Sequence, residues 1–364
     1  MVLLPLLGCG SVAPAPSDEP VVLEAEPAPP RPPDVLILLW DTVRADHLSL
    51  YGYDRPTTPR LDAFAREAAV YERAISSSMW TVPAHGSLFT GLPASSHGAR
   101  VGWLWLDGAH VTLPEHLADH GYATWAWSTN PYLSEQTNLL QGFETVRYAW
   151  REPDAEACGA ATSAKLIAGD RSSELSPGWS GSQGWPEHLV AYKDCAPHAV
   201  DAFLEWQGAL PEDRPYLAYV NLLEAHHPRV PSAASRAAVA PSEVVERSLA
   251  TDASLLRLMS AMEGHDTLDD EEREAVVATY DATLRDLDDA TGRLLDGLRD
   301  RGVLDRTVVI VVSDHGENLG ERGMWDHRWD LHQPLVHVPL IVRYPPSVVA
   351  GRHLDAVSTA NLFG

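Results

Sequence analysis

Three largely apolar runs set the strongest constraint on what this chain can fold into. Residues 34–40 read DVLILLW, residues 216–223 read YLAYVNLL, and residues 307–312 read TVVIVV. A continuous apolar run of this length, bounded by polar residues, is typical of a strand buried on both faces of a parallel sheet. Helical patterns lie between the runs, so the sequence predicts an α/β fold with a mostly parallel central sheet sandwiched by helices.

The helical patterns can be located from capping residues and apolar periodicity. They predict helices over residues 58–68, 112–120 and 198–206, a further strand over 122–128, a helical excursion over 231–270, and a long amphipathic helix over 276–298.

Chemically active residues directly follow the three apolar runs. Asp41 follows the first run, Glu224 and His226 follow the second, and Asp314 and His315 follow the third. Parallel strands end at the same edge of an open sheet, and ligands bind at that edge. We therefore expect these side chains to share one site. The alternative for the two aspartates is a role as turn caps.

The stretch SSSMWTVPAHGSLFTG, residues 76–91, places a hydroxyl at the start of a predicted helix. Pro83 suits a first helical turn, where the missing N–H costs nothing. The free N–H groups of that turn and the helix dipole can bind an anion beside the Thr81 hydroxyl. A phosphate or sulfate ester would be held there. The alternative is that Thr81 only caps an ordinary buried helix.

Composition limits the partners of the protein. The 364 residues are 45% hydrophobic, which is enough to bury one large core or two unequal ones. The formal net charge of -24 argues against nucleic acid and against anionic membrane surfaces as partners, because both require basic patches. An anionic substrate would therefore need a local positive site built from metal, histidine and helix ends.

The N-terminal residues predict export. Residues 1–9 end in LLGC, which resembles a bacterial lipoprotein signal in which Cys9 is lipidated, although no Lys or Arg precedes the apolar run. Residues 10–33 are rich in Pro and Ala and predict an extended linker. We expect a catalytic domain over residues 34–364 in a periplasmic or cell-surface protein that a lipid anchors to a bacterial membrane; a freely secreted protein is the alternative.

Two cysteines lie inside an irregular segment at about residues 151–197, which reads as an insertion over one face of the domain. In an exported protein Cys158 and Cys195 would form a disulfide, whereas a cytoplasmic protein would keep them as thiols.

Four stretches together resemble the sulfatase family of the alkaline phosphatase superfamily. They are DVLILLWDTVRADHLSLYGY from residue 34, SSSMWTVPAHGSLFTG from residue 76, NLLEAHHPRVP from residue 221 and VVIVVSDHGENLGERGMWDHRWDLHQPLVHVPLIVRYP from residue 308. The resemblance implies a hydrolase acting on ester bonds with one bound divalent cation. It implies that Asp41, Asp314, His315 and Thr81 bind the metal and that Thr81 is the nucleophile.

The resemblance also assigns residues that would contact the substrate. His226 and His327 would bind the substrate oxyanion or protonate the leaving group. Asn130 stands where the family has a lysine and would donate a neutral hydrogen bond. His85 stands at a catalytic position where the family has an arginine. Weaker candidates are Glu224, His332 and His337.

The chain departs from most sulfatases at the nucleophile. Their C-x-P-x-R or S-x-P-x-R stretch begins with a residue that is oxidised to formylglycine, whereas this chain reads TVPAH from residue 81. Threonine is a secondary alcohol, so its oxidation would give a ketone. The site therefore resembles the threonine-nucleophile branch, which handles phosphoryl groups. Because His315 is an imidazole ligand, Mn²⁺ or Zn²⁺ is favoured over Ca²⁺, and we expect Mn²⁺.

Three functions remain open at this point. The first is hydrolysis of a sulfuric, phosphoric or phosphonic ester through Thr81, with a small anionic ester or a sulfated or phosphorylated glycan as substrate. The second is transfer of a phosphoryl-linked head group, and the third is an inactive module that binds anionic glycans. The chain ends at Gly364, where the family continues into a smaller C-terminal subdomain, so we expect that subdomain to be missing.

Overall fold

The computed structural model describes residues 31–167 and 192–363. The described residues from Pro32 onward belong to one compact unit. The predicted signal with Cys9, the predicted linker up to residue 30 and the middle of the predicted insertion lie outside the described residues.

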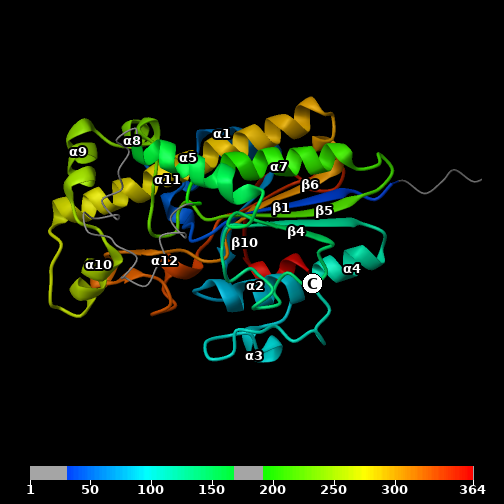
Figure 1. Ribbon diagram of the computed structural model, residues 1–364, viewed down its shortest axis with the longest axis horizontal. Coiled ribbons are helices and arrows are strands. Elements are labelled where there is room, and N and C mark those ends of the chain that lie inside the picture. The colour runs from blue at the N-terminus through cyan, green and yellow to red at the C-terminus, as the bar shows by residue number, and fades with distance from the viewer. Residues whose placement is uncertain (1–30, 168–191, 364) are drawn as a thin grey trace, which may run out of the picture. The chain divides into compact units, whose positions relative to one another are not determined.

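An eight-stranded sheet with the order β10-β2-β9-β6-β1-β5-β3-β4 forms the centre of this unit (Figure 1). The strands in the described part are β1 (Asp34–Trp40), β2 (Ala69–Ile75), β3 (Ala123–Ser128), β4 (Thr145–Tyr148), β5 (Tyr216–Leu222), β6 (Thr307–Val312), β7 (Asn318–Leu319), β8 (Trp325–Asp326), β9 (Leu340–Arg343) and β10 (Gly351–Ser358). Only β9 runs antiparallel to its neighbours in the large sheet, β2 and β6. The prediction of a mostly parallel central sheet is confirmed.

Strand β1 lies in the middle, paired in parallel with β5 on one side and β6 on the other. Its side chains alternate between two cores. Leu36 and Leu38 pack into one core with the helices of one face, and Ile37 and Leu39 pack into the other. This burial on both faces explains why the run is apolar without alternation.

Helices cover both faces of the sheet. The α-helices in the described part are α1 (Pro59–Phe64), α2 (Thr81–Thr90), α3 (Ala94–His97), α4 (Leu113–Asp119), α5 (Asp154–Ile167), α7 (Ala196–Ala209), α8 (Ala233–Val239), α9 (Ser242–Ala250), α10 (Leu255–Met262), α11 (Asp270–Asp300) and α12 (Gln333–Val336). Figure 1 shows α1, α5, α7 and α11 on one side of the strands and α2, α3 and α4 on the other. The prediction of a helix-covered sheet is confirmed.

Local signals explain several helix ends. The side chain of Thr112 accepts a hydrogen bond from the backbone N–H of Glu115, and the Glu115 carboxylate accepts the N–H of Thr112, which is a capping box at the start of α4. Helix α2 ends at Gly91, whose φ of 70° belongs to the left-handed region that glycine adopts without strain.

Some predicted boundaries differ from the structure. The helix expected over residues 58–68 is α-helical only to Phe64, because a 3-10 turn at Ala65–Glu67 leads into β2 at Ala69. The helix expected over 198–206 extends from Ala196 to Ala209. The helical excursion over 231–270 is confirmed as α8, α9 and α10.

The predicted irregular insertion contains regular structure. Residues 154–167 form helix α5, which is rich in alanine, so the expectation of an irregular segment is wrong for this part. A disulfide joins Cys158 of α5 to Cys195, directly before α7. Among residues 31–167 and 192–363, no helix has the length and apolar content needed to cross a membrane.

Candidate active site

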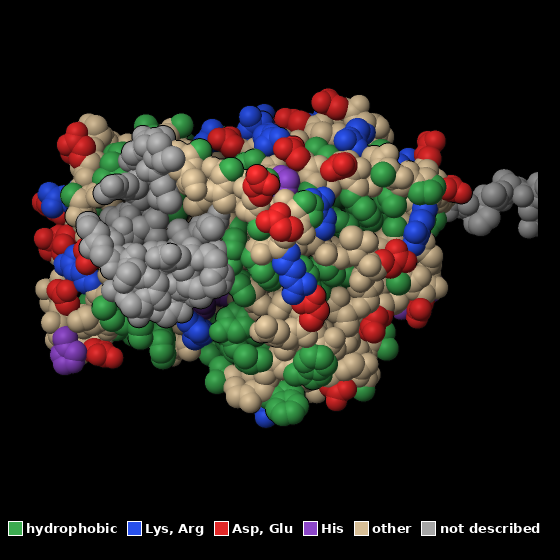
Figure 2. Space-filling view, viewed as in Figure 1, with side chains coloured by type: hydrophobic (Ala, Val, Ile, Leu, Met, Phe, Trp, Pro, Cys, Tyr) green, Lys and Arg blue, Asp and Glu red, His purple; other side chains and the backbone are tan. Residues whose placement is uncertain are grey.

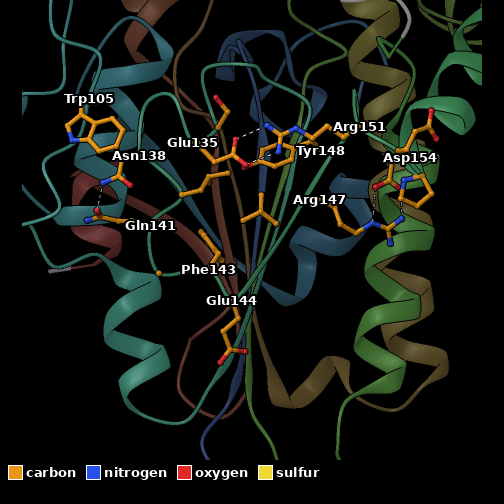
Figure 3. Close-up of a pocket in the computed structure, with 16 residues that line it drawn as sticks. Trp105, Glu135, Asn138, Gln141, Phe143, Glu144, Arg147, Tyr148, Arg151 and Asp154 are labelled. Atoms are coloured by element: carbon orange, nitrogen blue, oxygen red, sulfur yellow. Dashed lines mark hydrogen bonds and ion pairs between the residues drawn. The ribbon is translucent and has the colours of Figure 1, made fainter.

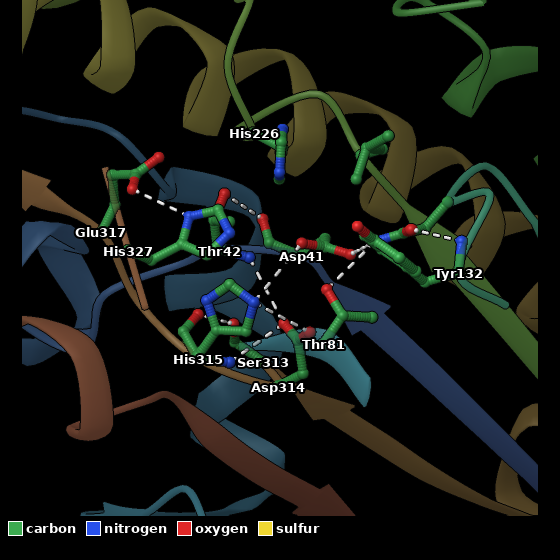
Figure 4. A network of polar contacts seen from close by, with 12 residues as sticks. Asp41, Thr42, Thr81, Tyr132, His226, Ser313, Asp314, His315, Glu317 and His327 are labelled. Atoms are coloured by element: carbon green, nitrogen blue, oxygen red, sulfur yellow. Dashed lines mark hydrogen bonds and ion pairs between the residues drawn. The ribbon is translucent and has the colours of Figure 1, made fainter. Parts of the chain in front are cut away.

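The polar residues that follow the parallel strands lie together at one edge of the sheet (Figure 4). Asp41 follows β1 and Asp314 follows β6, while Thr81 is the first residue of α2. Asn130 lies two residues beyond β3. All four are buried, with exposed fractions between 0% and 3%.

The amide of Asn130 links the predicted nucleophile to the first aspartate. Its Nδ2 donates to Oδ2 of Asp41 at 2.8 Å and to Oγ1 of Thr81 at 3.3 Å. Its Oδ1 accepts the backbone N–H of Tyr132 at 3.0 Å, which fixes the orientation of the amide. The Thr81 hydroxyl is therefore held beside the Asp41 carboxylate.

Asn221 holds this link in place from strand β5. Its Oδ1 accepts the backbone N–H of Thr129 at 3.3 Å and of Asn130 at 3.1 Å. Its Nδ2 donates to Oδ2 of Asp41 at 3.3 Å. Asn221 thus connects the loop after β3 to the carboxylate after β1.

Three buried ligand atoms of this site have no hydrogen-bond partner: Oδ1 of Asp41, Oδ2 of Asp314 and Nε2 of His315. Ligand atoms of these residues lie within 4.8 Å of one another. Nδ1 of His315 lies 2.9 Å from the carbonyl oxygen of Gly316 and donates to it, so Nε2 carries the lone pair. Two carboxylates and a neutral imidazole fit a divalent transition metal such as Mn²⁺ or Zn²⁺.

The electrostatics of this cluster favour the binding of a cation. Burial and the neighbouring Asp314 raise the pKa of Asp41 to about 6, and burial raises the pKa of Asp314 to about 7. Burial and the nearby His327 lower the pKa of His315 to about 4. Unpaired carboxylates are costly to bury, and a bound cation removes that cost.

The turn after β1 is held in a strained conformation. Thr42 has a φ of 61°, which is uncommon for a β-branched residue. The Tyr280 hydroxyl on α11 donates to the carbonyl oxygen of Thr42 at 2.9 Å and accepts the N–H of Arg44 at 3.0 Å. The N–H of Thr42 faces Oδ1 of Asp314 at 3.4 Å. Helix α11 therefore stabilises the conformation that presents Asp41.

His327 lies beside the cluster, with its ring centroid 4.5 Å from that of His315. Its Nδ1 faces Oε1 of Glu317 at 3.1 Å and Oδ1 of Asp326 at 3.0 Å. Burial alone would lower the pKa of His327, but the two carboxylates outweigh it and raise the pKa to about 10. The ring is therefore an imidazolium with Nε2–H available as a donor.

His226 approaches from the loop after β5, and its ring centroid lies 5.1 Å from that of His327. Figure 4 shows the His226 ring pointing toward the cluster. Its Nδ1 lies 2.5 Å from the carbonyl oxygen of His227, so Nδ1 carries the hydrogen and Nε2 the lone pair. Burial, Lys193 and His327 lower the pKa of His226 well below its usual value. His226 is therefore neutral.

His85 does not face the Thr81 hydroxyl. Its Nδ1 donates to the backbone carbonyl of Thr81 at 2.9 Å, and its Nε2 accepts from the Tyr219 hydroxyl at 2.6 Å. Burial lowers its pKa to about 3. Both ring nitrogens thus have partners in the protein and support the start of α2, and Nδ1 also lies 3.6 Å from Oδ2 of Asp314. The catalytic role predicted from the sequence stays a prediction.

The weaker candidates lie outside the cluster of unpartnered ligand atoms. Oε1 of Glu224 accepts the backbone N–H of Ala196 at 2.7 Å. Nε2 of His337 contacts the carbonyl oxygen of Glu72 at 2.9 Å, and His332 is exposed.

Sequence reasoning missed four residues that shape the site: Asn221, Tyr219, Glu317 and Asp326. A signal existed for Asn221, which is a polar residue inside an otherwise apolar strand. Asp326 directly precedes His327 in the sequence, so that neighbour could have been found, whereas only the fold brings Glu317 to His327.

Comparisons with known proteins identify the family of this chain. A family model described as Sulfatase matches residues 33–364. The N-acetylglucosamine-6-O-sulfatase of Bacteroides thetaiotaomicron is 23% identical over 372 residues, covering 90% of this chain and 65% of that protein. The chain therefore spans less than two thirds of the length of that relative.

Two solved structures share the fold. The phosphonate monoester hydrolase of Agrobacterium radiobacter superposes with a TM-score of 0.67 and 21% identity, covering 91% of this chain and 72% of that one. The soluble domain of lipooligosaccharide phosphoethanolamine transferase A from Neisseria meningitidis gives a TM-score of 0.59 and 19% identity, covering 94% and 89%. With the family model matching nearly all of the described residues, this chain belongs to the sulfatase family.

Proposed function

We propose that this protein is a metal-dependent hydrolase that cleaves a sulfuric, phosphoric or phosphonic ester through Thr81. One observation carries the proposal: the Asn130 amide links the Thr81 hydroxyl to Asp41, beside three buried ligand atoms without partners. The free N–H groups at the start of α2 add a place for ester oxygens. A divalent cation held by Asp41, Asp314 and His315, with Thr81 beside them, would neutralise ester charge and lower the hydroxyl pKa.

Two histidines of the chain, His226 and His327, would carry the protons. The Thr81 oxygen bonds to the sulfur or phosphorus, and its proton passes to Nε2 of His226. The bond to the leaving oxygen breaks, and that oxygen takes the proton from Nε2 of His327. Water then attacks the threonine ester and gives its proton to His327, while Thr81 recovers its proton from His226. Both histidines end in their starting states, as general acid–base catalysis requires.

The nucleophile favours a phosphoryl or phosphonyl ester over a sulfuric one. Threonine cannot form the aldehyde hydrate that releases sulfate in formylglycine sulfatases, whereas hydrolysis of a phosphothreonine by water needs no such group. The relative from Bacteroides thetaiotaomicron is named as a sulfatase of a sugar, N-acetylglucosamine, so a sulfuric ester remains the competing substrate.

A glycan substrate is supported by a cavity of about 770 Å³ that is lined by residues on and around β4 (Figure 3). Ser134 and Glu135 line it, and the same loop carries Asn130. Trp105 lines it as well. Figure 2 shows apolar side chains gathered in the lower middle of the view, in the region where Figure 1 places α2 and α3. Trp103 and Trp105 are 62% and 44% exposed. Aromatic faces beside a few polar groups suit the sugar part of an anionic glycan.

A head-group transferase is the second candidate, because the likeness to the phosphoethanolamine transferase domain extends over 94% of this chain. The first half of the reaction would be the same, and an alcohol would replace water in the second half. Export is part of the proposal, and the disulfide between Cys158 and Cys195 supports it.

Intact-protein mass spectrometry tests the proposal. The Mn²⁺-loaded protein is incubated with an aryl phosphate and, separately, an aryl sulfate, with Thr81→Ala as control. We expect a phosphate adduct, lost in Thr81→Ala, and release of the phenol. A sulfate adduct instead would establish a sulfatase, and release that increases with an added alcohol would establish a transferase. No adduct and no turnover with either ester would favour the inactive glycan-binding module.

A further inference from the structure

The turn that carries His226 is supported by a segment far from the metal cluster in sequence. We call residues 193–196, which read KDCA, the brace. The ammonium of Lys193 donates to the carbonyl oxygens of Leu223 and of His226, the latter at 2.8 Å. The N–H of Ala196 donates to Oε1 of Glu224 at 2.7 Å. The brace therefore contacts the turn over residues 223–226 at three points.

The brace is itself anchored to helix α5. The disulfide joins Cys195 to Cys158, and both residues are fully buried. The N–H of Asp194 donates to Oγ1 of Thr162 at 3.2 Å. The Asp194 carboxylate forms an ion pair with Lys165 at 2.6 Å. These contacts fix where the Lys193 side chain begins, so its ammonium has little freedom to leave the turn.

Lysine is rare in this chain, which makes this placement informative. The sequence contains only two lysines among 27 basic residues, Lys165 and Lys193, and both contact the brace or belong to it. Lys193 is only 2% exposed. Burying an ammonium is costly unless its hydrogen-bond donors are satisfied. The proposed proton transfers make no use of Lys193, so its burial at this turn calls for another role.

The orientation of the His226 ring depends on the backbone that Lys193 holds. The carbonyl that accepts from Lys193 belongs to the peptide joining His226 to His227. The carbonyl of His227 in turn accepts from Nδ1 of His226 at 2.5 Å, which sets the ring plane and leaves Nε2 facing the cluster. A shift of this backbone would therefore move Nε2 relative to His327.

We propose that Lys193 is a positioning residue that holds the turn over residues 223–226 and thereby sets the His226 ring in place for proton transfer. The kinetic test of this inference rests on the proposed function, because it measures ester hydrolysis. A purely structural role would change stability without acting through His226.

The test compares Lys193→Met with Arg236→Met. Arg236 is a matched control because it is a buried cation bonded to Ser248 and Thr279, away from the turn. We expect Lys193→Met to lower kcat for aryl phosphate hydrolysis about tenfold or more with little change in KM. Arg236→Met should lower the Tm with kcat retained. An unchanged kcat in Lys193→Met would overturn the proposal.

A double variant separates positioning from stability. In a His226→Gln background, Lys193→Met should lower kcat no further, because Lys193 acts through the His226 ring and that ring is absent from this background. A full additional loss would overturn the proposal. If Lys193→Met does not fold, Lys193→Gln, whose amide can still donate to one carbonyl, takes its place with the same outcomes.

A spectroscopic arm decides the question even if the wild-type protein hydrolyses no ester, which would refute the proposed function. Histidine-selective ¹⁵N labelling reports the ring nitrogens of His226, assigned by comparison with His226→Gln. The proposal expects these signals to shift in Lys193→Met and to stay in place in Arg236→Met. Signals unchanged in Lys193→Met would overturn it.

Discussion

Nδ1 of His327 lies 3.1 Å from Oε1 of Glu317, and the other oxygen of that carboxylate bonds the Arg229 guanidinium at 2.7 Å. The guanidinium thus shares the carboxylate with the ring. Arg229 also donates to the backbone carbonyl of Ala225, in the loop that carries His226. One buried ion pair therefore ties together the loops that supply both proposed proton carriers.

Replacing Glu317 with Gln should change the pH dependence of activity. The pKa of His327 is about 10 because Asp326 and Glu317 outweigh burial, so the wild-type kcat should fall on the alkaline side only near pH 10. Removing one carboxylate lowers that pKa, and the alkaline limb of the kcat–pH profile should move to lower pH. Glu321→Gln, which alters a carboxylate paired with Arg44, serves as control and should leave the limb in place. An unmoved limb in Glu317→Gln would contradict the role of the carboxylate.

The same ring should make stability depend on pH. The folded-state pKa of His327 is raised from 6.5 to about 10, so its protonation stabilises the fold fully below pH 6.5. That contribution is lost as the pH rises through 10. We expect the Tm of the metal-free protein to decline over this window and the decline to be shallower in His327→Gln. Parallel Tm profiles for the two proteins would show that the ring does not contribute.

Asn130→Asp should nearly abolish activity while leaving the fold intact. The new carboxylate would face Oδ2 of Asp41, which Asn130 now approaches at 2.8 Å as a donor, and could no longer donate to Thr81. We expect a loss of about 10²–10³ in kcat, the size seen when an active-site donor is removed. Circular dichroism checks folding. Asn138→Asp, in the cavity wall, is the control, and equal losses in both variants would refute a specific role for Asn130.

Metal binding should depend on the three unpartnered ligand atoms. We expect His315→Ala and Asp314→Asn to lose stoichiometric Mn²⁺ in elemental analysis by mass spectrometry, because each supplies one of these atoms. Asp326→Asn, whose carboxylate pairs with His327, should retain the metal. Mn²⁺ at about 100 times its Kd should stabilise the wild-type fold by about 2.7 kcal/mol. A Tm insensitive to both Mn²⁺ and EDTA would argue against a metal centre.

Removing the disulfide should lower stability substantially. Cys158 and Cys195 are 37 residues apart in sequence, and closing a loop of this length in the unfolded chain is expected to contribute about 4 kcal/mol. The Cys158→Ser/Cys195→Ser double variant should therefore unfold at lower urea concentration, and its m-value should rise because the unfolded chain without the cross-link exposes more surface. Ser87→Ala, a buried residue on α2, provides a comparison for an ordinary buried substitution. A midpoint equal to that of the wild type would contradict the expected stabilisation.

The sequence predicted the parallel sheet well because burial on both faces leaves a clear apolar signature in β1, β5 and β6. It predicted that Asp41, Asp314 and His315 would meet because strands of one direction end at one edge. Ends of helices were less accurate, as at Phe64, because a 3-10 turn and an α-helix share one apolar pattern.

The supporting residues could not be predicted in the same way. Glu317 lies in the loop between β6 and β7, and Asp326 is the last residue of the short strand β8. Their contacts with His327 depend on backbone turns that leave no periodic signal. The partner of His85 is Tyr219, which in sequence is only one more aromatic residue of a buried strand. Contacts between distant side chains arise from the packing of several elements, and no single stretch specifies them.

The pairing of β1 with β6 determines when, during synthesis, the candidate metal site can become complete. Asp34 at the start of β1 pairs with Thr307 of β6. These two neighbouring strands are therefore translated at widely separated times. Pairings over such sequence separations close slowly, after local helices have formed. Thr81 and Asp41 leave the ribosome early, yet they gain Asp314 and His315 only after β6 has been made and has docked. The candidate metal site of the nascent chain therefore stays incomplete until β6 and the residues after it have been translated.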